Sequence, residues 1–163
     1  MSFEAKVLRV MIASPGDVQE ERQAATDEVN DWNTVNAASR GIVLLPVRWE
    51  THTTPQFGAN PQVFVNKQIL DEADILIGIF GIRLGTPTTQ YPSGTVEEIS
   101  VHAGRQKTVK LYFSTAPLPR DYDHEQYAAL ERYRAKCQSE ALYWPFNDVA
   151  TFRKDFRRHL GNL

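Results

Sequence analysis

Cysteine is almost absent from this 163-residue chain, which contains only Cys137. A single thiol excludes an internal disulfide and a cysteine-rich metal site, and it is typical of proteins in reducing compartments. The four histidines are scattered along the chain and do not have the spacing of metal ligands. The sequence therefore predicts a protein without a metal site.

Long apolar runs and an excess of charge are also missing. No stretch approaches the roughly 20 apolar residues of a membrane span. The start of the chain, MSFEAKVLRV, lacks the apolar core of a signal peptide. The formal net charge is −2, whereas nucleic-acid-binding domains usually carry a clear basic excess. We therefore expect a cytoplasmic protein or module whose partners are neither a membrane nor nucleic acid.

Three motifs of common nucleotide and ester chemistry are absent as well. G-x-x-x-x-G-K-[ST] would indicate a P-loop, G-x-G-x-x-G after the first strand a dinucleotide redox site, and G-x-S-x-G a hydrolase nucleophile. Without repeats, low-complexity tracts or linkers, residues 1–163 have the size of one domain. These absences favour a site that uses carboxylates on a cationic reacting centre.

Short apolar runs alternate with longer amphipathic segments along the whole chain. The runs typical of strands are 6–13, 41–49, 74–80, 108–113 and 141–146. The segments typical of helices are 14–38, 60–73, 95–104, 123–140 and 148–160. Strict alternation predicts an α/β protein with one parallel sheet covered on both sides. Right-handed crossovers make this a five-stranded, flavodoxin-like three-layer sandwich with strand order 2-1-3-4-5.

Several details of this sheet and of its covering helices follow from the residues. The run 74–80 is the most continuous and predicts the central strand, buried on both faces. Pro46 predicts an edge position or a bulge for the second strand. In 60–73, Asn60 and Pro61 resemble a helix start. The basic face of 148–160 is expected to be solvated, where it also suits the negative end of the helix dipole, and its alternative is contact with a phosphate or a partner.

The predicted strand order also places the functional edge. Ligands of such sheets bind beyond the carboxyl ends of the strands, where the order reverses. Here that point lies between the first and third strands, so the segments 14–18 and 80–98 should meet there. Trp49 and Glu50 follow the second strand and are expected to overhang the rim.

Two adjacent glutamates, Glu97 and Glu98, lie in the first turn of the helix predicted to begin at Thr95. With Thr95 as N-cap, T-x-x-E is a capping box, which is the structural interpretation of Glu98. At about 100° per residue, Thr95, Glu98 and His102 share one flank, whereas Glu97 points to the other. The residues expected against the sheet are Val96, Ile99 and Ala103. The alternative interpretations of Glu98 are therefore a catalytic carboxylate, or a cap that also pairs with His102 at i, i+4.

Other candidates lie in the same two segments. Arg83 belongs to a glycine-containing loop at the end of a strand, a common place for ligand-binding residues, and its alternative is a surface charge. Ser14 either lines the pocket or caps the first helix, with Pro15 at its first position and Asp17 at its third. Tyr91 either stacks on a base or covers the edge of the core.

The segments VMIASPGDVQEER, ADILIGIFGIRLGTPT and SGTVEEI resemble a family of bacterial TIR-like domains. Those domains form N-terminal modules of larger signalling or defence proteins, many with STAND-type NTPase modules. The pattern ADILIG…GTVEEI…GRQKTV is also similar to the nucleoside 2-deoxyribosyltransferases, which share the flavodoxin-like arrangement. In that family GT-x-x-E supplies the catalytic glutamate, which corresponds to Glu98 here. The resemblance extends to the fourth predicted strand.

The resemblance implies a TIR-like NAD(+) nucleosidase that acts as an effector in bacterial antiviral defence or signalling. NAD would be the substrate, with no separate cofactor, and the domain would self-associate on activation, with a fused or partner sensor or NTPase module. Glu98 would be the catalytic carboxylate. The residues implied to hold the substrate or orient the helix start are Ser14, Arg83, Tyr91, Thr95 and His102.

The chemistry fits a site with one carboxylate. Cleavage of the bond between ribose and nicotinamide develops positive charge on the sugar, which a nearby carboxylate stabilises. The tryptophan-cysteine pair of NAD-cleaving TIR domains is absent from YPSGTVE, so the pocket suits NAD or another nucleotide. Two alternatives remain open: a non-catalytic self-association or adaptor domain, and a deoxyribosyltransferase-like enzyme that uses a free base as acceptor.

Overall fold

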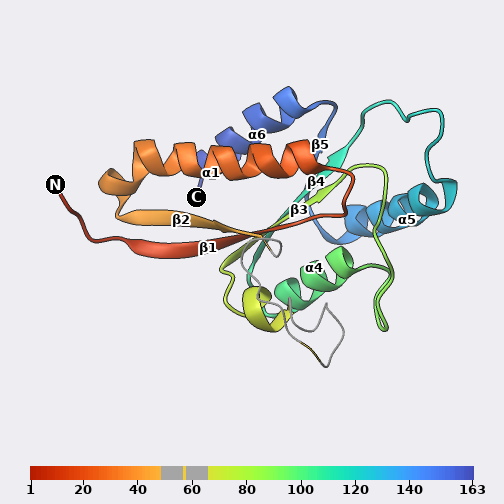
Figure 1. Cartoon of the computed structure of the whole chain (residues 1–163), viewed down its shortest axis with the longest axis horizontal. Helices are drawn as coiled ribbons and strands as arrows, with labels where there is room; N and C mark the ends of the chain where they lie inside the picture. The colour runs from red at the N-terminus through yellow and green to blue at the C-terminus, as the bar shows by residue number, and fades with distance from the viewer. Residues whose placement is uncertain (49–56, 58–65) are drawn as a thin grey trace.

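A computed structural model describes residues 1–48, 57 and 66–163 (Figure 1). Within these ranges, strands and helices alternate as the sequence predicts. The strands are β1 (Lys6–Ala13), β2 (Ile42–Val47), β3 (Ile75–Phe80), β4 (Thr108–Ser114) and β5 (Tyr143–Phe146). The helices are α1 (Gln19–Arg40), the π-helix η1 (Asn66–Leu70), α4 (Gly94–Gly104), α5 (His124–Glu140) and α6 (Val149–Gly161). Trp49, Glu50 and the predicted start of the second helix at Asn60 and Pro61 lie outside the described residues.

The five strands form one parallel sheet in the order β2-β1-β3-β4-β5, which confirms the predicted topology. β1 lies between β2 and β3, with Val10 opposite Pro46 on one side and Ile75 on the other. Pro46 is therefore on an edge strand, as its missing N–H predicts. All six residues of β3 are buried, which confirms it as the central strand.

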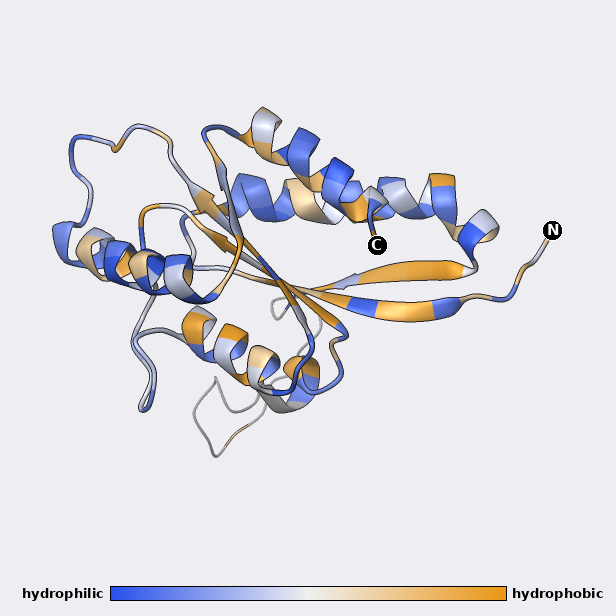
Figure 2. Cartoon of the chain, turned by 180° about the vertical axis from the view of Figure 1, so that it is seen from behind, coloured by the Kyte–Doolittle hydropathy of each residue, from blue (hydrophilic) through white to orange (hydrophobic). Residues whose placement is uncertain are grey.

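The helices cover both faces of this sheet (Figure 1). α1 and α6 lie on one face, where Trp32, Phe152 and Phe156 belong to one apolar cluster. η1, α4 and α5 lie on the other, where Phe80 and Phe113 stack with their ring centroids 5.1 Å apart. Figure 2 shows the strands as largely apolar, and in β3, where every residue is buried, both faces of the strand are covered. No helix in the described parts of the chain is long and apolar enough to cross a membrane.

The first helix begins later than predicted. α1 starts at Gln19, and its N-cap is Val18, which forms no side-chain capping bond. Ser14 is therefore not the cap, because residues 14–18 form a separate turn whose Asp17 carboxylate accepts a hydrogen bond from the Ile82 N–H at 2.8 Å. A contact between two loops thus replaces the local cap.

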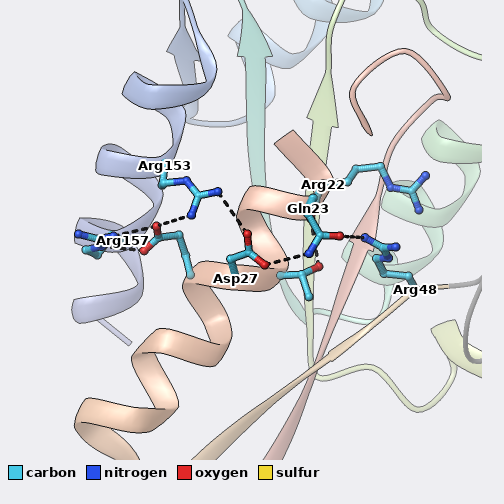
Figure 3. A network of polar contacts seen from close by, with 8 residues as sticks. Arg22, Gln23, Asp27, Arg48, Arg153 and Arg157 are labelled. Carbon is cyan, nitrogen blue, oxygen red and sulfur yellow. Dashed lines mark hydrogen bonds and ion pairs between the residues drawn. The ribbon is translucent and has the colours of Figure 1, made fainter. Parts of the chain in front are cut away.

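The basic face of α6 is not simply solvated, contrary to the sequence-based expectation. Arg157 donates two hydrogen bonds to Glu28 of α1, at 2.7 and 2.9 Å, and Arg153 contacts both Glu28 and Asp27 (Figure 3). The Glu28 side chain is fully buried. A buried carboxylate needs a partner, so the arginines of α6 balance the charge of Glu28 and thereby join α6 to α1.

Candidate functional site

The turn after β1 and the loop after β3 meet at the carboxyl edge of the sheet, as predicted. The Asp17 carboxylate bonds the Ile82 N–H, and a Cβ added at Gly81 would lie 2.6 Å from Asp17 Oδ2. The same Cβ would lie 2.7 Å from a methyl of Val18. Glycine at position 81 therefore permits the two segments to approach this closely.

The second half of the β3–α4 loop is fixed by two further elements. Gly85 has a φ of +107°, and a Cβ there would lie 3.3 Å from the Ser93 Cβ and 3.7 Å from a ring carbon of Pro15. Gln126 of α5 accepts hydrogen bonds from the N–H groups of Leu84 and Gly85 at 3.1 and 3.0 Å, and it donates one to the Gly85 carbonyl at 3.2 Å. The loop after β3 is thus contacted by Pro15, which follows β1, and by Gln126, which follows β4.

The start of α4 differs from the predicted capping box. Ser93 is the N-cap, and its hydroxyl accepts a hydrogen bond from the Val96 N–H at 3.1 Å. The third helical position is therefore Val96, so Glu98 lies beyond the positions that a capping box uses. Thr95 as the N-cap is wrong, because a serine two residues earlier has the extended backbone that a cap requires. Capping does not explain Glu98.

A flank of polar side chains on α4 is buried. Thr95 is 7% exposed, Glu98 6% and His102 0%, while Glu97 is partly exposed. All three residues of the predicted flank are therefore buried, and the two glutamates differ in exposure. Ala103, expected against the sheet, is exposed instead. Since polar side chains are seldom buried without a structural or functional reason, this flank is the most unusual feature of the helix.

His102 lies at the far end of this flank. Neither of its ring nitrogens has a hydrogen-bond partner among the described residues, so the i, i+4 pairing with Glu98 does not form. Burial lowers the pKa of His102, and the charges of Lys107 and Arg105 lower it further, against an opposing effect of Asp74. Asp74 and Lys107 directly precede β3 and β4, so His102 lies toward the amino edge of the sheet. His102 is therefore remote from the loops described above.

The remaining predicted residues occupy different positions at the carboxyl edge. The Ser14 hydroxyl is buried and has no hydrogen-bond partner among the described residues. Arg83 is exposed on the β3–α4 loop. The Tyr91 backbone closes a turn with Thr88, and its ring packs against the apolar cluster beneath α4. The structure therefore brings Ser14 and the loop of Arg83 to one edge, while Tyr91 contacts the core.

Several residues of this edge are missing from the sequence-based prediction. Gln126 is one, because its contacts lie in a loop distant in sequence and nothing in its own helix marks it. An aromatic cluster at the start of α5 is another. The centroid of the Tyr122 ring lies 4.2 Å from that of His124 and 5.5 Å from that of Tyr127. The described ranges contain no cluster of three or more His, Cys, Asp or Glu side chains able to hold a metal ion.

The parallel order 2-1-3-4-5, with helices on both faces, defines a flavodoxin-like α/β protein. Residues 9–161 match the model of a family described as a domain of unknown function, DUF4062, and the chain belongs to this family. No curated protein matches the chain.

Solved structures with this arrangement are only distantly similar. Oxidised flavodoxin 1 from Bacillus cereus is 12% identical with a TM-score of 0.45, over 98% of this chain and 99% of its own. An AraC family transcriptional regulator from Pseudomonas putida is 14% identical with a TM-score of 0.47, over 95% of this chain and 92% of its own. At such identities the likeness is one of fold and does not extend to a ligand or an activity.

Proposed function

We propose that this domain is a TIR-like NAD(+) nucleosidase with Glu98 as its catalytic carboxylate. The observation that carries the proposal is the burial of Glu98 at 6% exposure, on the helix that follows the central strand, at a position that capping does not use. The resemblance of the GT-x-x-E segment to nucleotide N-glycosidases supports the same residue. It also supports an effector role in bacterial defence or signalling, with self-association on activation.

The reaction is a hydrolysis of the bond between ribose C1′ and the nicotinamide nitrogen. The bonding electrons leave with nicotinamide, which departs neutral, and water adds to C1′ with release of a proton. Positive charge on the sugar peaks in the transition state, where a fixed carboxylate in a water-poor site lowers its energy. Because the leaving group needs no proton, neither a second acid nor a metal is required.

The other residues of the edge serve binding in this proposal. Arg83 is an exposed cation suited to the phosphates of the nucleotide. The Ser14 hydroxyl, next to the end of β1, is a hydrogen-bonding group without a partner among the described residues. Thr95 lies on the buried flank with Glu98, one turn nearer the start of α4.

The test is release of nicotinamide from NAD by the purified protein at high concentration or with a crowding agent. Glu98→Gln keeps the shape of the side chain and removes its charge, so we expect a rate at least about 100-fold lower. Glu97→Gln is the matched control, because it makes the same change at the adjacent, partly exposed position. Equal rates for the wild type and Glu98→Gln would remove Glu98 from its assigned role.

Two other outcomes would identify the alternatives. Absence of nicotinamide under every condition in which the domain self-associates favours a non-catalytic assembly or adaptor domain. Exchange of the base of a deoxynucleoside, without hydrolysis of NAD, favours a deoxyribosyltransferase-like enzyme.

A further inference from the structure

The site loop, which we define as residues 81–85, is held at both ends by side chains from other parts of the chain. At its start, Asp17 accepts the hydrogen bond from the Ile82 N–H at 2.8 Å. At its end, the Gln126 amide bonds the N–H groups of Leu84 and Gly85 and the Gly85 carbonyl. Only Arg83 lies between the residues whose backbone is bound in this way.

The Gln126 contacts fix the orientation of its amide. Two backbone N–H groups face one side-chain oxygen, which uses both of its acceptor positions, and the side-chain nitrogen meets a carbonyl. Gln126 itself is held in the first turn of α5, because its N–H donates to the Asp123 carboxylate at 3.0 Å. The loop is thereby attached to the amino end of a long helix, which is a rigid support.

Arg83 combines this fixed backbone with an unused charge. Its side chain is exposed, and it forms no ion pair or hydrogen bond with any described residue. Surface arginines are usually mobile, and binding a ligand then costs side-chain and loop entropy. A backbone held on both sides removes the loop's part of that cost, which favours Arg83 as a ligand-binding residue.

The charges beside the site loop, other than that of Arg83, are acidic at the start of α1. The start of α1 is acidic, since Glu20 and Glu21 follow Asp17 closely. Burial raises the pKa of Glu21, and the charges of Glu20 and Asp17 raise it further. This side of the edge therefore disfavours anions, and a phosphate that binds here requires the cation of the site loop. Arginine suits phosphate because its guanidinium donates two parallel hydrogen bonds.

We propose that Arg83 binds the diphosphate of a nucleotide and that Gln126 and Asp17 are its positioning residues. This inference rests on the proposed function, since it assigns part of the same substrate. In this arrangement Gln126 does not contact the ligand and affects binding only by holding the loop that carries Arg83. Loss of Gln126 should therefore weaken binding of a nucleoside diphosphate and leave binding of the corresponding nucleoside unchanged.

The experiment measures binding of ADP and of adenosine to the full chain by calorimetry, without any catalytic step. Arg83→Ala should weaken ADP binding about 10- to 100-fold, the usual effect of a charge-assisted hydrogen bond. Gln126→Leu should weaken it about 5- to 10-fold, because the loop loses its preorganisation but keeps its cation. Adenosine should bind all variants equally. The double variant should bind ADP no more weakly than Arg83→Ala alone, because Gln126 has no other target.

Two controls separate positioning from a general loss of structure. Gln126→Glu keeps the acceptor for the two N–H groups and loses the donor to the Gly85 carbonyl, so it should give an intermediate affinity. Gln138→Leu makes the same substitution as Gln126→Leu on an exposed position of the same helix and should leave ADP binding unchanged. Amide hydrogen exchange of residues 82–86 should rise in Gln126→Leu while the unfolding temperature of the domain stays well above that of the assay.

The binding measurements on ADP and adenosine can each contradict the assignment of Arg83 and Gln126. It is overturned if ADP does not bind, if adenosine is weakened as much as ADP, or if the effects of Arg83→Ala and Gln126→Leu multiply in the double variant. The nicotinamide assay is independent of these results. Coupled ADP binding without nicotinamide release would retain the inference and reject the nucleosidase, and the reverse combination would do the opposite.

Discussion

Two buried ionisable side chains, one in each helical layer, differ in their partners. Between α1 and α6, the fully buried Glu28 is bonded by Arg157 and contacted by Arg153. On the other side of the sheet, His102 is equally buried, and neither ring nitrogen has a hydrogen-bond partner among the described residues. The first arrangement is a structural joint between helices. His102 has no such joint, and it lies in the layer that carries the candidate site.

The largest effect is expected where the buried charge is partnered. Glu28→Ala removes the carboxylate on which both arginines converge, and loss of one member of a buried ion pair typically costs about 3–5 kcal/mol. We expect the lower end, about 3 kcal/mol, because the arginines lie near the surface and regain water. Urea unfolding measures this loss. Asp31→Asn, an exposed change one turn further along α1, is the control and should cost less than about 0.5 kcal/mol.

A smaller effect is expected in the site loop. Gly85→Ala forces a side chain into a backbone with φ +107° and into contact with Ser93, which should cost about 1–3 kcal/mol. Gly104→Ala, at the end of α4 with no atom within 4 Å of the added Cβ, is the matched change and should be neutral or slightly stabilising. Thermal unfolding of the two variants compares them. Equal stability would mean that the loop conformation is not fixed as described.

The smallest effect is a dependence on pH. Because the pKa of His102 is lowered in the folded protein, the unfolded chain binds the proton more readily. The stability that the neutral His102 side chain contributes is therefore fully present above the ordinary pKa of 6.5. It is lost as the pH falls from there toward the lowered pKa of the folded protein. For one proton the slope does not exceed about 1.4 kcal/mol per pH unit.

The measurement is urea unfolding at pH 7.5 and at pH 5. His102→Leu should lose less stability on acidification than the wild type, and His124→Gln, an exposed change, should behave like the wild type. The pKa of His159 is also lowered by burial, so an acid effect unchanged in His102→Leu would assign it to His159 and contradict the comparison.

Local patterns account for most of the fold and part of the site. The all-apolar run of β3, the proline of the edge strand and the alternation of elements give the topology directly, because they depend on neighbours in sequence. The shared burial of Thr95, Glu98 and His102 follows from helical periodicity in the same way. The cap at Ser93 was misplaced by two residues, since serine and threonine both suit that position.

The sequence by itself determined the five strands, their parallel order and the flank of α4 that carries Glu98, because these follow from periodicity and from the handedness of crossovers. Only the tertiary structure decided which polar side chains are partnered. Glu28 meets an arginine 129 positions away, and Gln126 meets a glycine 41 positions away. Such contacts form between residues that share no local pattern, so folding must bring them together before either side chain acquires its role.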